Sequence, residues 1–254
     1  MGLKKYLANF LTLIYFFVFK IKYDIIIFSH VPQCGGNSIL HVFKFFLGYR
    51  FLNIHRKDIE YFKKNPKKLK KKLNGKILIL GHFGVDFVST IEKLYNKKRV
   101  YYMLNIRNPK NRYLSNYYRN KKLNNLSISL LEFLKKRRNE KLDNLYVRFL
   151  SGKNIYQPGK TKINKKIFLI ANQNIKKFDS IIFLENLKFD MQLVIKKLFY
   201  FNIFSNLFFS QKNKVSDSSY KKVSKLEKNI ISKLTYYDNL IYKNLKKKYE
   251  NSTI

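Results

Sequence analysis

Five short apolar runs, separated by longer stretches, constrain the fold of this 254-residue chain more than any other feature. The runs span residues 24–29, 76–80, 100–106, 166–171 and 180–184. Runs of this length and composition are typical of buried strands, and the stretches between them are long enough to hold crossover helices. The pattern therefore predicts an α/β fold with a mostly parallel central sheet flanked by helices. Since no Pro-, Gly- or Ser-rich linker divides the chain and 46% of it is hydrophobic, we expect a single domain.

The first apolar run leads directly into a glycine turn, residues 30–38, which read HVPQCGGNS. A glycine turn between a strand and a helix directs backbone N–H groups at a bound phosphate or sulfate. The segment lacks both the Lys-Ser/Thr ending of a P-loop NTPase and the G-x-G-x-x-G of a dinucleotide fold. By itself such a turn is more often structural, so its interpretation depends on the rest of the sequence.

A second motif follows the apolar run at 100–106. Arg107 leaves the predicted strand, Pro109 is placed to start a helix, and Ser115 lies about two turns along that helix. An Arg at a strand end and a Ser on the next helix can hold one phosphate from two sides. A surface ion pair is the alternative for Arg107, but a basic residue between a strand and a Pro favours binding.

Taken in order, the motifs resemble the carbohydrate sulfotransferases that use 3'-phosphoadenosine-5'-phosphosulfate (PAPS). The similar branch has a P-K-T-G-G-T-S-like first motif, as in heparan sulfate 2-O-sulfotransferase-type enzymes. The resemblance runs through residues 30–38, 81–83, 107–118 and 144–152, and continues weakly through 178–185 and a terminal helix at 234–242. It covers most of the chain, and four ordered motifs are more specific than any one of them.

The resemblance implies sulfuryl transfer from PAPS to a hydroxyl of a polysaccharide or glycolipid, with no metal. It implies a P-loop-like turn around the 5'-phosphosulfate and an Arg and a Ser on the 3'-phosphate of the nucleotide. By position, the second pair is Arg107 and Ser115. The turn comprises Gln33, Cys34, Gly35, Gly36, Asn37 and Ser38.

Gln33 departs from the family pattern, which has a Lys at this position beside the departing phosphate. A glutamine still donates a hydrogen bond, but a neutral hydrogen bond contributes roughly 0.5–1.5 kcal/mol against about 1.5–3 kcal/mol for a charged one. Either a nearby Lys or Arg takes the role of the charge, or the chain is a catalytically weak or silent protein that binds nucleotide or glycan. The sequence leaves both open, and Gln33 is included among the expected catalytic residues.

His82 is the expected general base, since an acceptor hydroxyl loses its proton as it attacks sulfur and imidazole suits that task at neutral pH. It follows the apolar run at 76–80, which places it at a strand end, where open α/β sheets bind ligands. His30 is expected to pack or hydrogen-bond at the rim of the turn. Arg148 is a weak candidate for substrate binding, with capping of helix carbonyls as the equal alternative.

The charge balance predicts attraction to polyanions. The chain has 53 Lys and Arg against 15 Asp and Glu, a net charge of +38. An anionic carbohydrate acceptor or an anionic membrane fits this charge. A nucleic-acid-binding protein is the less favoured alternative, because the aromatic residues fall mostly in apolar segments and no nucleic-acid motif is present. The basic run Lys67–Lys72 is expected to be a solvated loop or helix face, and 51–74 and 121–143 are expected to be basic acceptor loops.

Residues 1–22 are expected to form a hydrophobic helix, followed by a sulfotransferase-like domain over 23–254. The apolar stretch Tyr6–Phe19 is shorter than the roughly 20 residues of a membrane span, which favours peripheral packing or a membrane surface over a short anchor. Cys34 is the single cysteine, so no intrachain disulfide forms and a reducing compartment is favoured. The expected location is the cytoplasm or a membrane surface, with a Golgi-type membrane anchored by the N-terminus as the alternative.

Overall fold

A computed structural model of the chain describes residues 21–47, 50–95, 98–123, 127–152, 161–199 and 223–252. Contacts group the chain into two compact units. Unit 1 comprises residues 1–83, 87–105 and 178–212, and unit 2 comprises 84–86, 106–177 and 213–254. Neither unit is a continuous stretch of chain, which explains why the sequence shows no linker.

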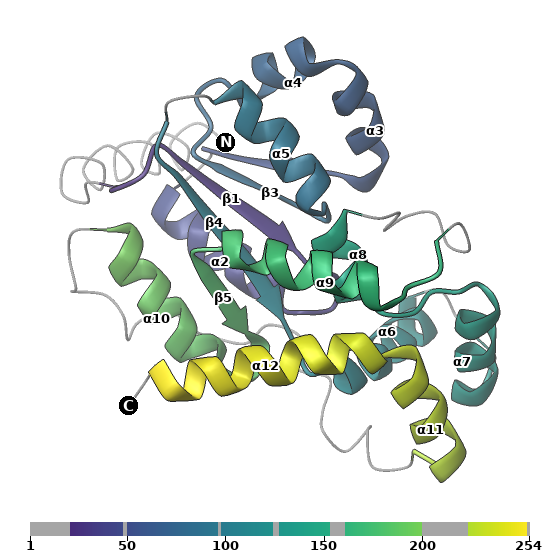
Figure 1. Cartoon of the computed structure of the whole chain (residues 1–254). Coiled ribbons are helices and arrows are strands. Elements are labelled where there is room, and N and C mark those ends of the chain that lie inside the picture. Colours follow the sequence, from purple (N-terminus) through teal and green to yellow (C-terminus); the bar gives the residue numbers. More distant parts are fainter. Residues whose placement is uncertain are drawn as a thin grey trace. The chain divides into compact units, whose positions relative to one another are not determined.

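Unit 1 is built on a five-stranded sheet with the order β2-β3-β1-β4-β5 (Figure 1). The β2–β3, β3–β1 and β1–β4 pairs are parallel, so the predicted α/β fold is confirmed. The strands are β1 (Ile25–His30), β2 (Phe51–Ile54), β3 (Leu78–Gly81), β4 (Val100–Ile106) and β5 (Ser180–Phe183). The helices are α2 (Gly36–Leu47), α3 (Arg56–Lys64), α4 (Pro66–Leu73), α5 (Val85–Leu94) and α10 (Leu187–Leu198), with the 3-10 turn η2 (Leu184–Asn186) before α10.

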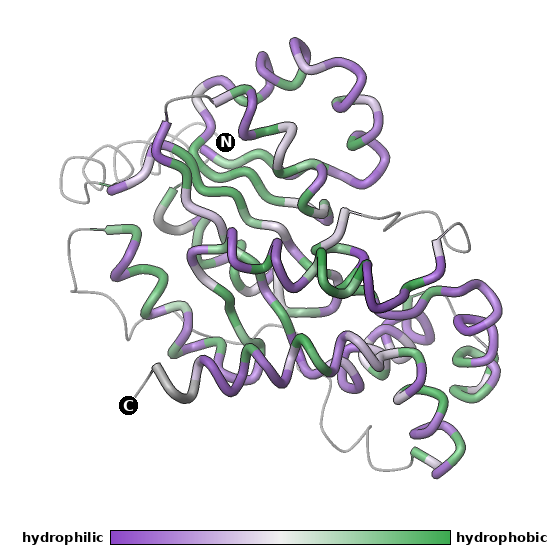
Figure 2. The backbone as a smooth tube through the Cα atoms, in the orientation of Figure 1, coloured by the Kyte–Doolittle hydropathy of each residue, from purple (hydrophilic) through white to green (hydrophobic). Residues whose placement is uncertain are grey.

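The core of unit 1 follows the two-residue alternation of its strands. Ile26 and Phe28 of β1 lie on one face of the sheet with Leu78, Leu80 and Met103 of the neighbouring strands, packed against α2 and α10. Figure 1 shows α2 behind β1 and β4, whereas α5 lies in front of β3. The central strands are the most continuous apolar segments of the backbone in Figure 2. This burial holds the strand ends, and hence the residues that follow them, in fixed positions.

Unit 2 is mainly helical in its described residues. Its helices are α6 (Pro109–Leu123), α7 (Leu130–Asn139), α8 (Leu145–Ser151), α9 (Lys165–Asn174), α11 (Lys225–Leu234) and α12 (Tyr236–Ser252), with the 3-10 turn η1 (Ile175–Lys177). A core of buried side chains from α6, α7 and α11, including Tyr113, Leu134 and Ile231, joins three of them. Ser129 and Ser224 begin α7 and α11 with capping boxes, which satisfy the first N–H groups of each helix.

The apolar run at 166–171 was predicted as a strand, and this prediction is wrong, because the segment lies within α9. Short apolar runs are compatible with both structures. The Asn164 side chain accepts from the Ile167 N–H and begins a helix. Ile167, Ala171 and Ile175 recur every four residues, which gives the helix its inward face.

The two segments predicted as loops are also mainly regular structure. Residues 51–74 contain β2, α3 and α4, and residues 121–143 contain the end of α6 and all of α7. The basic run Lys67–Lys72 therefore lies on helix α4, whose Leu69 and Leu73 are buried. The abundance of Lys and Asn hid the helical spacing of the few apolar residues in these segments.

The predicted N-terminal helix at 1–22 lies outside the described residues apart from its last two positions. In the part of the chain that is described, no helix has both the length and the apolar character needed to cross a bilayer.

Candidate active site

The glycine turn after β1 has the backbone conformation of a tight cradle. Pro32 and Gln33 form a turn, and Gln33 has a φ of 67°. Few residues other than glycine adopt a positive φ, so this conformation is held by its surroundings. The Gly35 carbonyl accepts from the N–H groups of Ser38 and Ile39 at 3.0 and 3.2 Å, which begins α2 at Gly36.

Both of these positions in the turn require glycine, because other side chains approach them closely. At Gly35, with a φ of 81°, an added Cβ would lie 2.4 Å from Leu184 Cδ1. At Gly36, an added Cβ would lie 1.9 Å from His30 Nε2. The His30 ring therefore lies directly against the first residue of α2. This contact confirms the packing role predicted for His30 at the rim of the turn.

Asn105, near the end of β4, holds both ends of the turn. Its Oδ1 accepts from the Val31 N–H at 2.8 Å, and its Nδ2 donates to the Cys34 carbonyl at 2.7 Å. Asn105 is fully buried. The sequence analysis missed this residue, although an amide within an apolar strand is a signal that it has polar partners to satisfy.

His82 follows β3 and contacts the residue that precedes the turn. Its Nδ1 lies 2.7 Å from the His30 carbonyl oxygen. A carbonyl oxygen only accepts, so Nδ1 carries the proton of this hydrogen bond and the neutral ring has its lone pair on Nε2. The His82 and His30 rings have centroids 4.4 Å apart, and the Ser29 hydroxyl donates to the Phe83 carbonyl. The structure thus brings together a histidine of defined tautomer and the glycine turn within unit 1.

The remaining predicted residues lie in unit 2. The Tyr146 hydroxyl accepts from the Arg107 N–H at 3.1 Å and donates to the Arg107 carbonyl. One hydroxyl therefore holds both backbone groups of Arg107, and the 144–152 motif acts in unit 2 as a support for this residue. Ser115 is buried on α6, three residues after the buried Arg112, so the two share one face of that helix.

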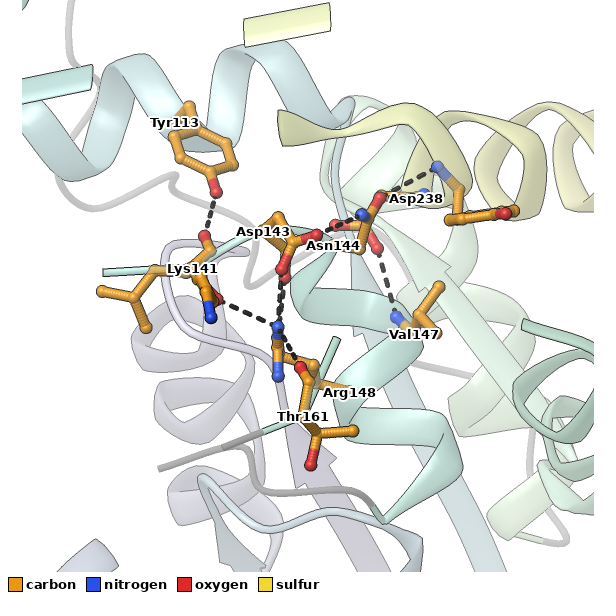
Figure 3. Close-up of polar contacts among 10 residues, drawn as sticks. Tyr113, Lys141, Asp143, Asn144, Val147, Arg148, Thr161 and Asp238 are labelled. Carbon is orange, nitrogen blue, oxygen red and sulfur yellow. Dashed lines mark hydrogen bonds and ion pairs between the residues drawn. The ribbon is translucent and has the colours of Figure 1, made fainter. Parts of the chain in front are cut away.

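Arg148 of α8 lies in the interior of unit 2, with a side chain that is 2% exposed. Its guanidinium donates to the carbonyls of Lys141, Asp143 and Thr161 and to the Asp143 carboxylate, at 2.5–3.1 Å (Figure 3). These carbonyls lie between α7 and α8 and at residue 161 and not at a helix end, so the contacts differ from the predicted capping of helix carbonyls. Arg148 fixes the turn before α8 to the segment at 161.

The geometry of the turn fits an anionic ligand. The first N–H groups of a helix have no partner inside that helix, and Gly36 and Asn37 are the first residues of α2. The Leu184 and His30 side chains lie against Gly35 and Gly36 and border this start of the helix. Asn37 is exposed and Gln33 is half-buried, whereas the Cys34 side chain is fully buried and packs in the turn. An anion bound at this turn would therefore contact chiefly backbone groups.

A parallel α/β sheet with a glycine turn at the carboxyl end of a central strand is an arrangement in which many proteins bind phosphate groups. A family model described as "Sulfotransferase family" matches residues 17–252, and the chain belongs to this family. The family comprises enzymes of sulfuryl transfer, for which PAPS is the donor.

Comparison with other proteins adds two solved structures. A mouse sulfotransferase, SULT7A1, complexed with PAP is 16% identical, with 85% of this chain and 66% of that chain covered and a TM-score of 0.42. The PezAT toxin–antitoxin system of Streptococcus pneumoniae is 13% identical, with 92% and 96% covered and a TM-score of 0.35. The chain thus spans about two thirds of the mouse enzyme. Among curated proteins, none matches the chain.

Proposed function

We propose that this sulfotransferase moves a sulfuryl group from PAPS to a hydroxyl of a carbohydrate, either a polysaccharide or a glycolipid. The observation that carries the proposal is the contact between His82 and His30 beside the glycine turn. A base of defined tautomer and a backbone anion cradle in the same unit are the two parts that sulfuryl transfer needs. The carbohydrate acceptor is supported by the resemblance of the ordered motifs and by the net charge of +38, which suits an anionic glycan.

In this proposal, residues 33–38 bind the 5'-phosphosulfate, and Arg107 and Ser115 bind the 3'-phosphate. Bound PAPS supplies an activated sulfuryl group on a phosphate that can leave. Little covalent chemistry is required from the protein, so positioning and charge stabilisation dominate its contribution. The helix N-terminus at Gly36 and Asn37 provides backbone donors and a positive dipole end for this charge.

His82 accepts the proton of the acceptor hydroxyl through Nε2. The His30 carbonyl keeps Nδ1 protonated and orients the ring, which is the role that a backbone acceptor commonly has beside a catalytic histidine. Proton transfer to a positioned base typically contributes 10²–10⁴-fold in rate.

The first prediction concerns the nucleotide and the base together. We expect calorimetry to show tighter binding of adenosine 3',5'-bisphosphate than of AMP, in salt that suppresses nonspecific attraction to the basic surface. His82→Ala should retain this selectivity and lower transfer of labelled sulfate from PAPS by about 10²-fold or more. Arg107→Ala should remove the selectivity, because the lost contact is to the 3'-phosphate. Equal binding of the two nucleotides by the unmodified chain would contradict the proposal.

The second prediction addresses Gln33, for which a weak enzyme and a silent binding protein are the alternatives. Gln33→Lys adds a charged donor to the turn, and we expect the rate of transfer to rise by about tenfold, since charged hydrogen bonds contribute roughly 1–2 kcal/mol more than neutral ones. Gln33→Met is the matched control, which keeps the length of the side chain without the donor and should lower the rate. Absence of transfer in all three forms, with bisphosphate binding intact, would favour the silent binding protein.

The location of the chain is part of the same proposal. A polysaccharide or glycolipid acceptor suits a protein in the cytoplasm or at a membrane surface, with anchoring in a Golgi-type membrane as the alternative. Fractionation of the full chain in low and high salt distinguishes these locations. Release from membranes by salt would support peripheral contact, whereas release by detergent alone would support the anchored alternative.

A further inference from the structure

A second basic site lies at the opposite edge of the sheet of unit 1. An open hollow of about 1060 Å³ is lined by residues that directly precede the strands, among them Asp24 before β1 and Ile77 before β3. The glycine turn and His82 follow the carboxyl ends of the same two strands. The six residues of β1 separate the two edges by roughly 20 Å at about 3.3 Å per residue. The hollow, named here the amino-edge hollow, is therefore distinct from the transfer site.

The lining of the amino-edge hollow is strongly positive. Six basic residues line it: Arg50, Lys67, Lys70, Lys71, Lys76 and Lys98. Among its described lining residues one is acidic, Asp24, and this carboxylate accepts from the Arg99 N–H at 2.9 Å and lies 3.6 Å from the Arg99 guanidinium. Asp24 is thus engaged by a base outside the lining. The lining therefore contains six basic residues and one acidic residue, so its net charge is strongly positive.

The lysines of helix α4 make two different kinds of contact. Leu69 and Leu73 are buried, while Lys68 and Lys72 extend over the rings of Tyr61 and Phe62 of α3, with ammonium-to-centroid distances of 5.3 and 5.2 Å. The other three lysines, at 67, 70 and 71, have i, i+3 and i+4 spacing and line the hollow. In Figure 2, α4 is mainly hydrophilic, in contrast to the strands. Two lysines of the basic run therefore pack on α3, and three line the amino-edge hollow.

We propose that the amino-edge hollow is a second anion site, which binds a segment of an acidic polysaccharide outside the transfer site. Five of the six bases are lysines, which act as flexible point charges and suit repeated sulfate or carboxylate groups on a flexible chain. The volume lies just above the 300–1,000 Å³ range of small-molecule pockets, which suits a chain segment. The choice of a glycan as the polyanion rests on the proposed function.

The aromatic residues of the lining argue against a nucleic acid. Single-stranded nucleic acids are bound through aromatic rings on which bases stack. The Tyr23 ring packs against Tyr101 with centroids 4.8 Å apart. The Tyr95 ring carries the Lys98 ammonium 5.4 Å from its centroid, and its hydroxyl donates to the Leu73 carbonyl. Both rings have contacts within the protein, so a polyanion in the hollow would be recognised through its charge and not through stacking.

The test compares two triple variants of the full chain that remove equal charge. The hollow variant combines Lys67→Gln, Lys70→Gln and Lys71→Gln, and the matched control combines Lys225→Gln, Lys228→Gln and Lys233→Gln on the exposed face of α11. Glutamine has nearly the helix propensity of lysine, so both helices are retained. The probes are a heparin-derived octasaccharide and a twelve-residue thymidine oligonucleotide, titrated at 0.15 M salt.

We expect the hollow variant to bind the octasaccharide about 30-fold more weakly, since each of the three exposed ion contacts contributes on the order of threefold, and the control to change by less than about threefold. Lys76→Gln combined with Lys98→Gln should weaken binding without any change in α4. The proposal would be overturned if both triple variants lost equal affinity for the octasaccharide. It would also be overturned if the unmodified chain bound the oligonucleotide more tightly than the octasaccharide and the hollow variant lost that affinity to the same extent. Binding of adenosine 3',5'-bisphosphate should be unchanged in every variant. If the unmodified chain binds octasaccharide through the hollow but no bisphosphate, the proposed function fails and the anion site stands.

Discussion

At the scale of single residues, the site depends on groups that touch no ligand. Asn105 joins the Val31 N–H to the Cys34 carbonyl, and the His30 carbonyl selects the tautomer of His82. Each contact links residues more than fifty positions apart in the chain. The residues that bind or react are recognisable as a motif, whereas the residues that hold them become recognisable only in the folded chain.

Asn105→Asp tests this supporting role. The carboxylate retains an acceptor for the Val31 N–H but loses the donor to the Cys34 carbonyl, which is then left buried without that partner. We expect affinity for adenosine 3',5'-bisphosphate to fall about tenfold, which corresponds to a hydrogen bond of roughly 1.4 kcal/mol. Asn174→Asp is the matched control, because its amide donates to the Leu150 carbonyl in unit 2. Equal losses of affinity in the two variants would show that Asn105 does not support the turn.

At the scale of the elements, short helices are positioned by a few polar anchors. Helix α8 has seven residues, begins after Asn144, and is held by the contacts of Arg148 to the segments before and after it. The Asn144 side chain also accepts from the Tyr237 N–H of α12 at 2.9 Å (Figure 3). The Tyr146 hydroxyl of the same helix hydrogen-bonds the backbone of Arg107. The position of α8 therefore helps to fix Arg107, a residue of the candidate site.

Arg148→Met separates structural from substrate-binding roles. Removal of the buried guanidinium breaks its ion pair with Asp143 and leaves the carbonyls of Lys141 and Thr161 without this donor, and we expect urea unfolding to show a loss of about 3 kcal/mol. The control Arg137→Met removes a partly exposed pair with Glu140 and should cost about 1 kcal/mol or less. An unchanged unfolding free energy with a raised KM for the acceptor would instead assign Arg148 to substrate binding.

At the scale of the whole molecule, stability depends on a buried acid of unit 2. Asp238 of α12 is fully buried, accepts from the Val147 N–H at 3.1 Å, and has an Oδ2 without a hydrogen-bond partner among the described residues. Burial raises its pKa from 3.8 to about 7, against the opposing effect of the Arg112 charge. Folding therefore favours the protonated form of this carboxyl.

The sign of the pH dependence follows from this shift. Between pH 3.8 and about 7 the folded chain retains a proton that the unfolded chain has released, so the contribution of Asp238 to stability is full below pH 3.8 and is lost as the pH rises to 7. Asp238→Asn removes this contribution. We expect the unfolding free energy of the unmodified chain, minus that of the variant, to decrease from pH 5 to pH 8 and then to level off. A difference that does not change with pH would show that Asp238 titrates alike in both states.

Strong local signals in the sequence predict the strands β1, β3, β4 and β5, the glycine turn and the helix after Pro109, all of which the structure contains. Continuous apolar runs require burial, and glycine and proline restrict the backbone wherever they occur. Local signals also led to His82, Arg107 and Ser115. The strand β2 and the helices α3, α4 and α7 were missed because lysine and asparagine dominate their exposed faces, and α9 was mistaken for a strand because its apolar run is short.

Only the tertiary structure decided what these residues contact. The support of the turn by Asn105, the tautomer of His82 and the enclosure of Arg148 all depend on hydrogen bonds between distant segments. A parallel sheet brings the starts of its strands to one edge and their ends to the other. Bases spread from residue 50 to residue 98 therefore line one hollow, while the last residue of β1 contacts the histidine after β3 at the opposite edge. Strand pairing, which no local pattern specifies, brings each of these two groups of residues together.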